Sequence, residues 1–488
     1  MEKIRSSLLL SFLEKYITLA IQIVATIVTA RLLTPAETGL YSVASALVGV
    51  AQTLRDFGIC SYVVQESELS AERHATALGI ALALGCLMAS VFAMTSGWVA
   101  AFFAEPQLQT IVLILCANFI LVAFSSIGQA QLCRAMNFGA ALRIGIVATS
   151  VHAITMVVLA DLGYGALSMA WASVLSIAAQ FIGYTIYYPK TVLTIPSFKE
   201  WRRVCNFGFF VSGGSLLQEL SQRLPDIVVG RMLGFSAAGF YSRGNGLVNL
   251  FELAFMNGVA PVASSAMAHL NRNDQSMVNP YLKMLGLTTV VAWPFLGMLA
   301  LLAQPMVHLA FGDQWLPAVP IAQILCFGTA IGLLGRLGMS MFTATGHVRR
   351  LLAVQLIAVP AQALALLIGA RYSTEMAAVG VGVGGLALAS LSLYHSNRAL
   401  GTTWLQIVSE LTRSLMITVA SLALPSAIVL TNGIDLHNFW PPTLFAGIAG
   451  VASWSVCLFI VGHPIKSEIL LVISKLRSAR ADLTRQRG

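Results

Sequence analysis

The sequence predicts an all-α polytopic membrane protein with about 14 transmembrane helices. Of its 488 residues, 57% are hydrophobic and only 10% are charged, whereas soluble domains average about 45–50% apolar and about 25% charged residues. Such a chain has too few polar side chains to cover a water-exposed surface. The residue alternation that a transmembrane β-barrel requires is absent. The seven cysteines are scattered without a CxxC pair, which argues against a disulfide framework and against a metal site.

Each predicted span contains about 20 mostly apolar residues, the length needed to cross a hydrocarbon core about 30 Å thick. In chain order the spans are 8–33, 38–58, 76–103, 108–132, 143–160, 164–188, 207–233, 238–262, 281–304, 317–342, 351–370, 377–397, 412–431 and 441–462. They group into an N-terminal six-helix bundle (1–190), a cytoplasmic amphipathic linker (191–206), a C-terminal six-helix bundle (207–400), two extra transmembrane helices (401–465) and a basic cytoplasmic tail (466–488).

The positive charge of the chain predicts its orientation. If the N-terminus is cytoplasmic, most of the 29 lysines and arginines fall in cytoplasmic segments, where basic residues of membrane proteins concentrate. Both termini of this multi-pass membrane protein are therefore expected in the cytoplasm. The net charge of +9 is explained by topology, so no nucleic-acid partner is expected.

An internal repeat appears when the chain is compared with itself at an offset of 200 residues. The identical pairs are Gln22/Gln222, Ile27/Ile227, Val28/Val228, Arg31/Arg231, Leu33/Leu233, Gly39/Gly239, Tyr41/Tyr241, Ser42/Ser242, Leu47/Leu247 and Val48/Val248. The first and seventh spans are therefore counterparts. Six spans separate them, so the two six-helix repeats are predicted to be parallel, around a central cavity, as in several transporter folds.

Polar residues inside four of the spans follow helical spacing and predict the walls of that cavity. Such stripes do not face lipid, so they are expected to line a hydrated space. The cavity residues predicted in this way are Thr18, Gln22, Gln52, Gln218, Gln222, Asn245 and Asn249.

Charged residues within the spans are the predicted substrate and coupling groups, because a charge at bilayer depth is unfavourable by at least ~2.5–3.5 kcal/mol. Glu219, Arg223 and Asp226 lie on one helix next to Pro225, which would kink it. The predicted anion-binding residues are Arg223, Lys15, Arg243, Arg31, Arg231 and Arg336, and the ion-coupling candidates are Glu219, Asp226 and Glu252. For Arg223 a static pair with Glu219 is the alternative, and for Arg31 and Arg231 it is snorkelling to headgroups.

Several stretches resemble landmarks of a known family. The hairpin from Arg31 to Ser42, its counterpart from Arg231 to Ser242, Asp56-Phe57-Gly58 and Phe311-Gly312-Asp313-Gln314-Trp315 resemble the polysaccharide-transport flippases of the multidrug/oligosaccharidyl-lipid/polysaccharide flippase superfamily. The resemblance covers roughly residues 5–400. It implies two six-helix bundles with alternating access, two extra C-terminal helices, and a polyprenyl-pyrophosphate-linked oligosaccharide as cargo for exopolysaccharide, O-antigen or capsule assembly.

Two other functions are alternatives to a flippase: an ion-coupled multidrug or small-molecule exporter of the same superfamily, and a polysaccharide polymerase or ligase. An exporter of cationic drugs favours an acidic cavity, and the basic residues here argue against it. An enzyme is not expected, because no loop between spans is long enough for a catalytic domain. No cofactor is expected either. The glycines from Gly380 to Gly385 follow no predicted strand, so they indicate close helix packing rather than nucleotide binding. The expected partners are the lipid-linked oligosaccharide, membrane lipids, and a polysaccharide polymerase with its export machinery.

Overall fold

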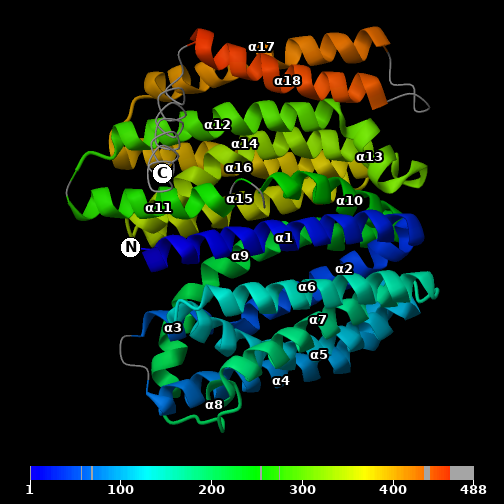
Figure 1. The fold of residues 1–488 in the computed structure, drawn as a ribbon, viewed down its shortest axis with the longest axis vertical. Coiled ribbons are helices and arrows are strands. Elements are labelled where there is room, and N and C mark those ends of the chain that lie inside the picture. The colour runs from blue at the N-terminus through cyan, green and yellow to red at the C-terminus, as the bar shows by residue number, and fades with distance from the viewer. Residues whose placement is uncertain are drawn as a thin grey trace, which may run out of the picture. The chain divides into compact units, whose positions relative to one another are not determined.

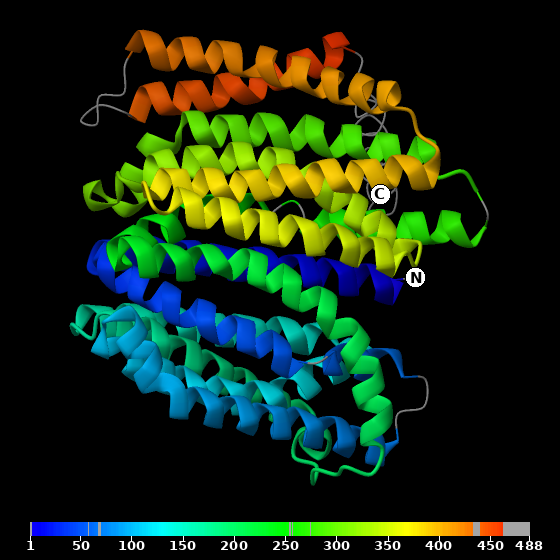
Figure 2. The ribbon, with the colours of Figure 1, turned by 180° about the vertical axis from the view of Figure 1, so that it is seen from behind.

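A computed structural model describes residues 2–56, 58–66, 70–252, 255, 257–273, 275–432 and 440–461, which are helical and contain no strand (Figures 1 and 2). The predicted basic tail, 466–488, lies outside these ranges. The helices are α1 Glu2–Leu32, α2 Pro35–Asp56, α3 Ile59–Gln65, α4 Ala71–Phe103, α5 Pro106–Arg134, α6 Phe138–Asp161, α7 Ala166–Tyr187, α8 Pro189–Val192, α9 Trp201–Leu233, α10 Phe235–Phe251, α11 Asn257–Arg272, α12 Val278–Leu301, α13 Ala303–Phe311, the 3₁₀ turn η2 Asp313–Trp315, α14 Ala318–Ala344, α15 Val348–Gly369, α16 Thr374–Leu400, α17 Trp404–Asn432 and α18 Trp440–Val461.

Eleven helices in the described part of the chain are long and apolar enough to cross a membrane: α1, α4, α5, α6, α7, α12, α14, α15, α16, α17 and α18. The chain is therefore a multi-pass membrane protein. The predicted second, seventh and eighth spans, which lie in α2, α9 and α10, are not among the eleven. These are three of the four helices with predicted polar stripes. Polar and charged residues lower the hydropathy of α2 and α9, whereas α10, at 17 residues, is shorter than a lone span requires. The count of fourteen stays a prediction.

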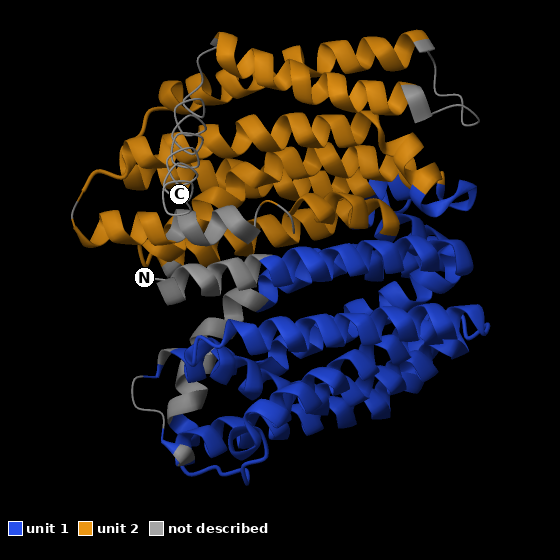
Figure 3. Cartoon of the chain, viewed as in Figure 1, with its two compact units in different colours: residues 1–242, 310–315, 367–377 blue, residues 243–309, 316–366, 378–488 orange. Residues whose placement is uncertain are grey.

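The chain folds into two compact units (Figure 3). Unit 1 contains residues 1–242, 310–315 and 367–377, and unit 2 contains 243–309, 316–366 and 378–488. Unit 1 therefore includes the predicted N-terminal bundle and linker, but also α9 and the first turns of α10, which the sequence assigns to the second repeat. Because α9 packs along α2, its contacts place it in unit 1, whereas the internal repeat places it in the second half of the chain. The predicted domain limits remain a prediction about the repeats.

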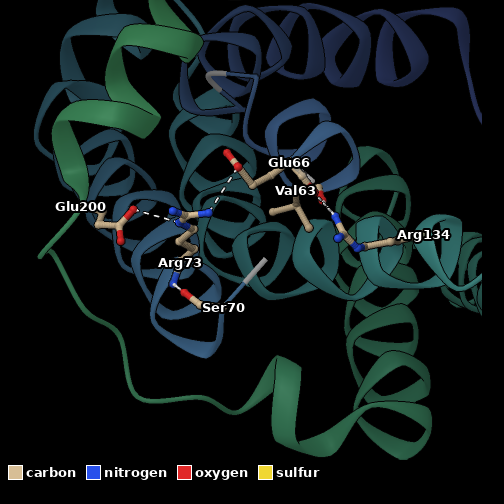
Figure 4. A network of polar contacts seen from close by, with 6 residues as sticks. All are labelled: Val63, Glu66, Ser70, Arg73, Arg134 and Glu200. Carbon is tan, nitrogen blue, oxygen red and sulfur yellow. Dashed lines mark hydrogen bonds and ion pairs between the residues drawn. The ribbon is translucent and has the colours of Figure 1, made fainter. Parts of the chain in front are cut away.

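Unit 1 has its own apolar core. Residues of α3, α4 and α5, among them Val63, Leu78 and Ile127, are buried together. At the end of α3, Arg134 of α5 donates hydrogen bonds to the carbonyl oxygens of Val63 and Glu66 (Figure 4). This arginine thereby satisfies carbonyl groups that a helix C-terminus leaves without intrahelical partners.

The first turns of α2 and α10 cross within unit 1 at a pair of glycines. A Cβ atom on Gly39 would lie 1.8 Å from the carbonyl oxygen of Phe235, and one on Gly239 would lie 2.0 Å from that of Pro35. Both contacts join residues that correspond at the offset of 200, so the crossing is reciprocal, like an isologous contact about a two-fold axis. This local geometry agrees with the predicted repeat.

The C-terminus of α1 is capped by a distant segment of unit 1. Trp315 donates its indole N–H to the carbonyl oxygen of Ala30 over 2.7 Å, and the amide of Gln314 donates to the same oxygen over 2.8 Å. Trp315 is completely buried and its ring meets that of Phe240 edge to face. In the first repeat the counterparts of α12 and α14 are α4 and α5, and only Ala104 and Glu105 lie between them. The capping segment therefore belongs to the longer connection of the second repeat and has no counterpart in the first.

Removing the indole of Trp315 is therefore expected to destabilise unit 1. Trp315→Phe keeps a ring but loses one hydrogen bond, about 1 kcal/mol, and Trp315→Ala also leaves a cavity, about 3–5 kcal/mol. Thermal unfolding of the solubilised protein should rank wild type above Trp315→Phe and Trp315→Ala lowest. Trp98→Ala is the control, because Trp98 is 83% exposed. Equal midpoints for the two alanine variants would contradict the capping role.

Unit 2 is held by small residues and by hydrogen bonds between helices. Gly380 of α16 lies against the backbone of Leu366 in α15, and Gly385 lies against that of Gly328 in α14, which confirms close packing as the role of this glycine run. The two extra helices pack on α12 (Figures 1 and 2). Here Thr289 bonds Ser414 of α17 over 2.8 Å, and Trp454 of α18 donates to the carbonyl oxygen of Val290.

Candidate functional site

Polar side chains of α9 and α2 meet inside unit 1. Asp226 is buried, with 7% of its surface exposed, and its carboxylate accepts a hydrogen bond of 2.6 Å from the hydroxyl of Ser42. Helix α9 reaches this contact one turn after Arg223, and α2 reaches it one turn after Gly39. The carboxylate predicted from the sequence therefore has a specific partner on the neighbouring polar stripe, as buried polar groups require.

Arg223 and Glu219 form an ion pair on the adjacent turn of α9. The guanidinium Nε donates to the Glu219 carboxylate over 2.8 Å, and the side chains are 43% and 25% exposed, respectively. Gly49 of α2 makes room for them, since a Cβ atom there would lie 3.3 Å from Arg223 Nε. The ion pair that was the alternative to anion binding by Arg223 is thus present, but it uses only one edge of the guanidinium, and almost half of the arginine side chain remains accessible.

A further polar contact in unit 1 joins α5 and α7. The amide of Asn118 in α5 donates to the hydroxyl of Ser173 in α7 over 3.0 Å. The sequence reasoning missed both residues. Asn118 could have been found, because an asparagine in the middle of a very apolar span requires a hydrogen-bond partner. Ser173 gave no comparable signal. We call Ser42, Gly49, Glu219, Arg223 and Asp226 the α2–α9 cluster.

The other predicted residues of unit 1 lie outside this cluster's contacts. Lys15, Gln22, Arg31, Gln218, Gln222 and Arg231 are exposed, whereas Thr18 and Gln52 are half-buried. The hydroxyl of Thr18 bonds the carbonyl oxygen of Glu14 within its own helix. The guanidinium of Arg231 lies 4.8 Å from the ring centre of Phe102, a cation–π contact at the end of its helix.

Unit 2 contains a second charged pair. Arg336 of α14 and Glu252, which directly follows α10, form an ion pair of 2.6 Å, and their side chains are 37% and 27% exposed. Arg243 is buried, Asn245 is half-buried and Asn249 is exposed along α10. Two of the predicted charged residues, 84 positions apart in the chain, are therefore in contact in the structure. A single sequence does not reveal such a contact.

The α2–α9 cluster combines two chemical functions. A guanidinium presents a planar set of donors that matches phosphate oxygens, and one edge of Arg223 is already oriented by Glu219. Asp226 supplies a buried carboxylate that can hold a cation or proton next to a hydroxyl. The arrangement thus offers donors that suit an anionic group and an acceptor that suits a proton or a cation.

A family model described as polysaccharide biosynthesis protein matches residues 28–320, more than half of the chain. The chain belongs to this family. The match includes α2, α9 and α10, and thus the whole α2–α9 cluster together with the reciprocal glycine crossing.

Named relatives are similar to the chain over about two thirds of its length, and a solved structure has the same fold. The chain is 23% identical over 349 residues to the lipopolysaccharide biosynthesis protein WzxC of Escherichia coli, covering 69% of this chain and 68% of that protein. It is 24% identical to the succinoglycan biosynthesis transport protein ExoT of Rhizobium meliloti, over 66% and 65% of the two chains. The lipid II flippase MurJ in an inward closed conformation has the same fold, with a TM-score of 0.73, 12% identity, and coverage of 93% and 98%.

Proposed function

We propose that this protein is a flippase. It moves a polyprenyl-pyrophosphate-linked oligosaccharide repeat unit from the cytoplasmic to the periplasmic leaflet of the bacterial inner membrane, by alternating access. The glycan enters exopolysaccharide, O-antigen or capsule assembly. The observation that carries the proposal is the α2–α9 cluster in a chain of the polysaccharide biosynthesis family, because it places an accessible guanidinium beside a buried carboxylate in a multi-pass membrane protein.

The chemistry of such a cargo explains the residues. The pyrophosphate is anionic, the glycan is rich in hydroxyls and the polyprenyl tail is apolar. Arg223 is the proposed pyrophosphate ligand, with Lys15, Arg31, Arg231, Arg243 and Arg336 as further basic candidates. Polar residues of the predicted cavity serve the sugar hydroxyls, and the tail stays in lipid. WzxC and ExoT are named for lipopolysaccharide biosynthesis and succinoglycan transport, which supports a glycan as the cargo here.

The driving force is proposed to be an ion gradient or the consumption of the product on the outer side. Glu219, Asp226 and Glu252 are the coupling candidates. Asp226 is the strongest of them, because it is the most buried and accepts a short hydrogen bond from Ser42. Both termini are placed in the cytoplasm, in accord with the distribution of basic residues. A polysaccharide polymerase and its export machinery are the proposed partners downstream, and we assign the chain no catalytic step.

Deleting the gene in its native host tests the function. We expect one surface glycan to be lost and its lipid-linked repeat unit to accumulate on the cytoplasmic leaflet, where an added membrane-impermeant glycosidase cannot reach it in intact spheroplasts. Complementation with the wild-type chain should restore the glycan. A normal glycan together with increased drug sensitivity would favour an exporter instead, and loss of the lipid-linked unit itself would indicate an enzyme.

A further inference from the structure

The connecting segment, residues 189–202, joins α7 to α9 and is anchored at its start. It directly follows the span that ends at Tyr187. Val192 is completely buried in an apolar cluster with Leu132, Ala140 and Ile144 of α5 and α6. The segment therefore does not hang free from its two helices.

The middle of the connecting segment is docked on the first turns of α4. The backbone N–H of Ser197 donates to the carbonyl oxygen of Ala75 over 3.0 Å. Gly79 makes this approach possible, because a Cβ atom at that position would lie 2.3 Å from the carbonyl oxygen of Ser197. Backbone is thus packed on backbone, which defines the position of this segment on unit 1.

Ion pairs hold the end of the connecting segment on the same helix. Arg73 of α4 donates to Glu200 over 3.1 Å and to Glu66 over 3.3 Å (Figure 4). Lys199 pairs with Glu72 over 2.9 Å, and this hydrogen bond raises the pKa of Lys199. One side of the segment is therefore occupied by contacts with α4.

The opposite side of the connecting segment presents large apolar side chains. Leu193, Ile195, Phe198 and Trp201 are all at least half exposed, and Ile195 is 85% exposed. Anchored residues alternate with exposed ones, so Val192 and Ser197 face unit 1 while their neighbours face away. Four large apolar side chains on one short connection form an unusual surface for a loop, because loops are ordinarily polar.

Basic side chains flank this apolar surface. Lys190 and Arg202 are exposed, and the guanidinium of Arg202 lies 5.6 Å from the ring centre of Trp201. Residues 189–202 contain Lys190, Lys199 and Arg202 against one acid, Glu200. Apolar side chains next to basic ones are the pattern that binds the headgroup region of an anionic membrane.

The position of the connecting segment along α7 and α4 is consistent with contact to lipid headgroups. The segment begins where the span of α7 ends, and it docks within the first two turns of the span of α4, which begins at Glu72. The span of α4 has 32 residues, a length of about 48 Å, whereas the hydrocarbon core is about 30 Å thick. The first turns of α4, and the segment docked on them, can therefore lie in the headgroup region. Tyr187, Tyr188 and Trp201 are aromatic residues of the kind that concentrate at this depth.

We propose that the connecting segment is a membrane-surface anchor that binds anionic phospholipid headgroups of the cytoplasmic leaflet. Leu193, Ile195, Phe198 and Trp201 insert between the lipids, and Lys190 and Arg202 bind their phosphates. Because the segment is fixed to α4, this binding holds unit 1 against the leaflet while α9, which starts at Trp201, leads away from it. The inference requires only a membrane-embedded chain and is independent of the transported cargo.

A single fluorescent label tests the insertion. The seven cysteines are replaced by alanine in the full chain, Ile195→Cys is labelled with nitrobenzoxadiazole, and the protein is placed in nanodiscs of phosphatidylcholine with or without phosphatidylglycerol. We expect blue-shifted emission and quenching by brominated phosphatidylglycerol. Gln275→Cys is the control, because Gln275 is an exposed polar residue in the connection between α11 and α12, and its label should stay in water.

The charge requirement is tested by neutralising the flanking residues. With Lys190→Gln and Arg202→Gln together, the preference of the quenching for brominated phosphatidylglycerol over brominated phosphatidylcholine should fall roughly five-fold per charge removed. Arg349→Gln with Arg398→Gln removes two exposed charges elsewhere and should leave the preference unchanged. A label at position 195 that stays aqueous in every lipid mixture, or a preference that survives the neutralisation, would overturn the proposal, even if the protein proves to be a flippase.

Discussion

Arg223→Ala is expected to abolish transport of the lipid-linked repeat unit while the protein stays inserted at near-normal abundance. The Arg223 side chain is 43% exposed and its guanidinium uses one edge to bind Glu219, so the remaining donors are available for the pyrophosphate. Hydrogen bonds to charged groups contribute about 1.5–3 kcal/mol each, and losing two of them lowers transport by about a hundredfold or more. Transport is measured as surface glycan restored in the deletion strain, and abundance by immunoblotting of membranes.

The matched control for this variant is Arg413→Ala in α17. Arg413 also pairs with a glutamate on its own helix, Glu410 at 3.1 Å, and its side chain is 53% exposed. Removing it should leave transport unchanged. Arg223→Lys should retain partial transport, because lysine keeps the charge but lacks the planar set of donors.

A double variant distinguishes ligand binding from a structural ion pair. If Arg223 only neutralises Glu219, removing it alone leaves an unpaired carboxylate and abundance should fall, whereas Glu219→Gln with Arg223→Gln should regain activity because no unpaired charge remains. If Arg223 binds the pyrophosphate, the double variant stays inactive at normal abundance. Transport by the double variant would therefore refute the role of Arg223 as a ligand.

Gly39→Ala and Gly239→Ala are expected to give the largest structural effects. Each methyl group would lie within 2.0 Å of a backbone carbonyl oxygen of the other helix, and a backbone atom cannot rotate away as a side chain can. The helices must separate at the crossing of α2 and α10, and overpacking of this kind destabilises by about 1–3 kcal/mol or more. Membrane abundance and the thermal midpoint of the solubilised protein should both fall.

Gly246→Ala is the control for the glycine crossing, since it lies on α10 with no atom within 4 Å of its added Cβ. It should be neutral. Gly39→Ala combined with Gly239→Ala should be less harmful than the sum of the two, because both methyl groups separate the same pair of helices. If Gly39→Ala behaves like Gly246→Ala, the reciprocal crossing does not determine how the two repeats meet.

The sequence by itself determined the class of the protein, its family and the position of most helices. Apolar stretches long enough to cross a bilayer are a local property, because each helix satisfies its own backbone hydrogen bonds in lipid. The offset of 200 residues likewise needs no coordinates, and it already paired Gly39 with Gly239. Helix geometry places Glu219 and Arg223, four positions apart, on one face, and a static pair between them was the alternative to anion binding by Arg223.

Only the tertiary structure decided which distant residues meet. The contacts of Asp226 with Ser42, Arg336 with Glu252, and Trp315 with Ala30 join residues separated by 84 to 285 positions, and no periodicity within a helix specifies them. Two of the helices that do not qualify as lone spans, α2 and α9, contain the α2–α9 cluster. Their polar groups are satisfied by neighbouring helices rather than by their own backbone, which is why this site required the folded chain.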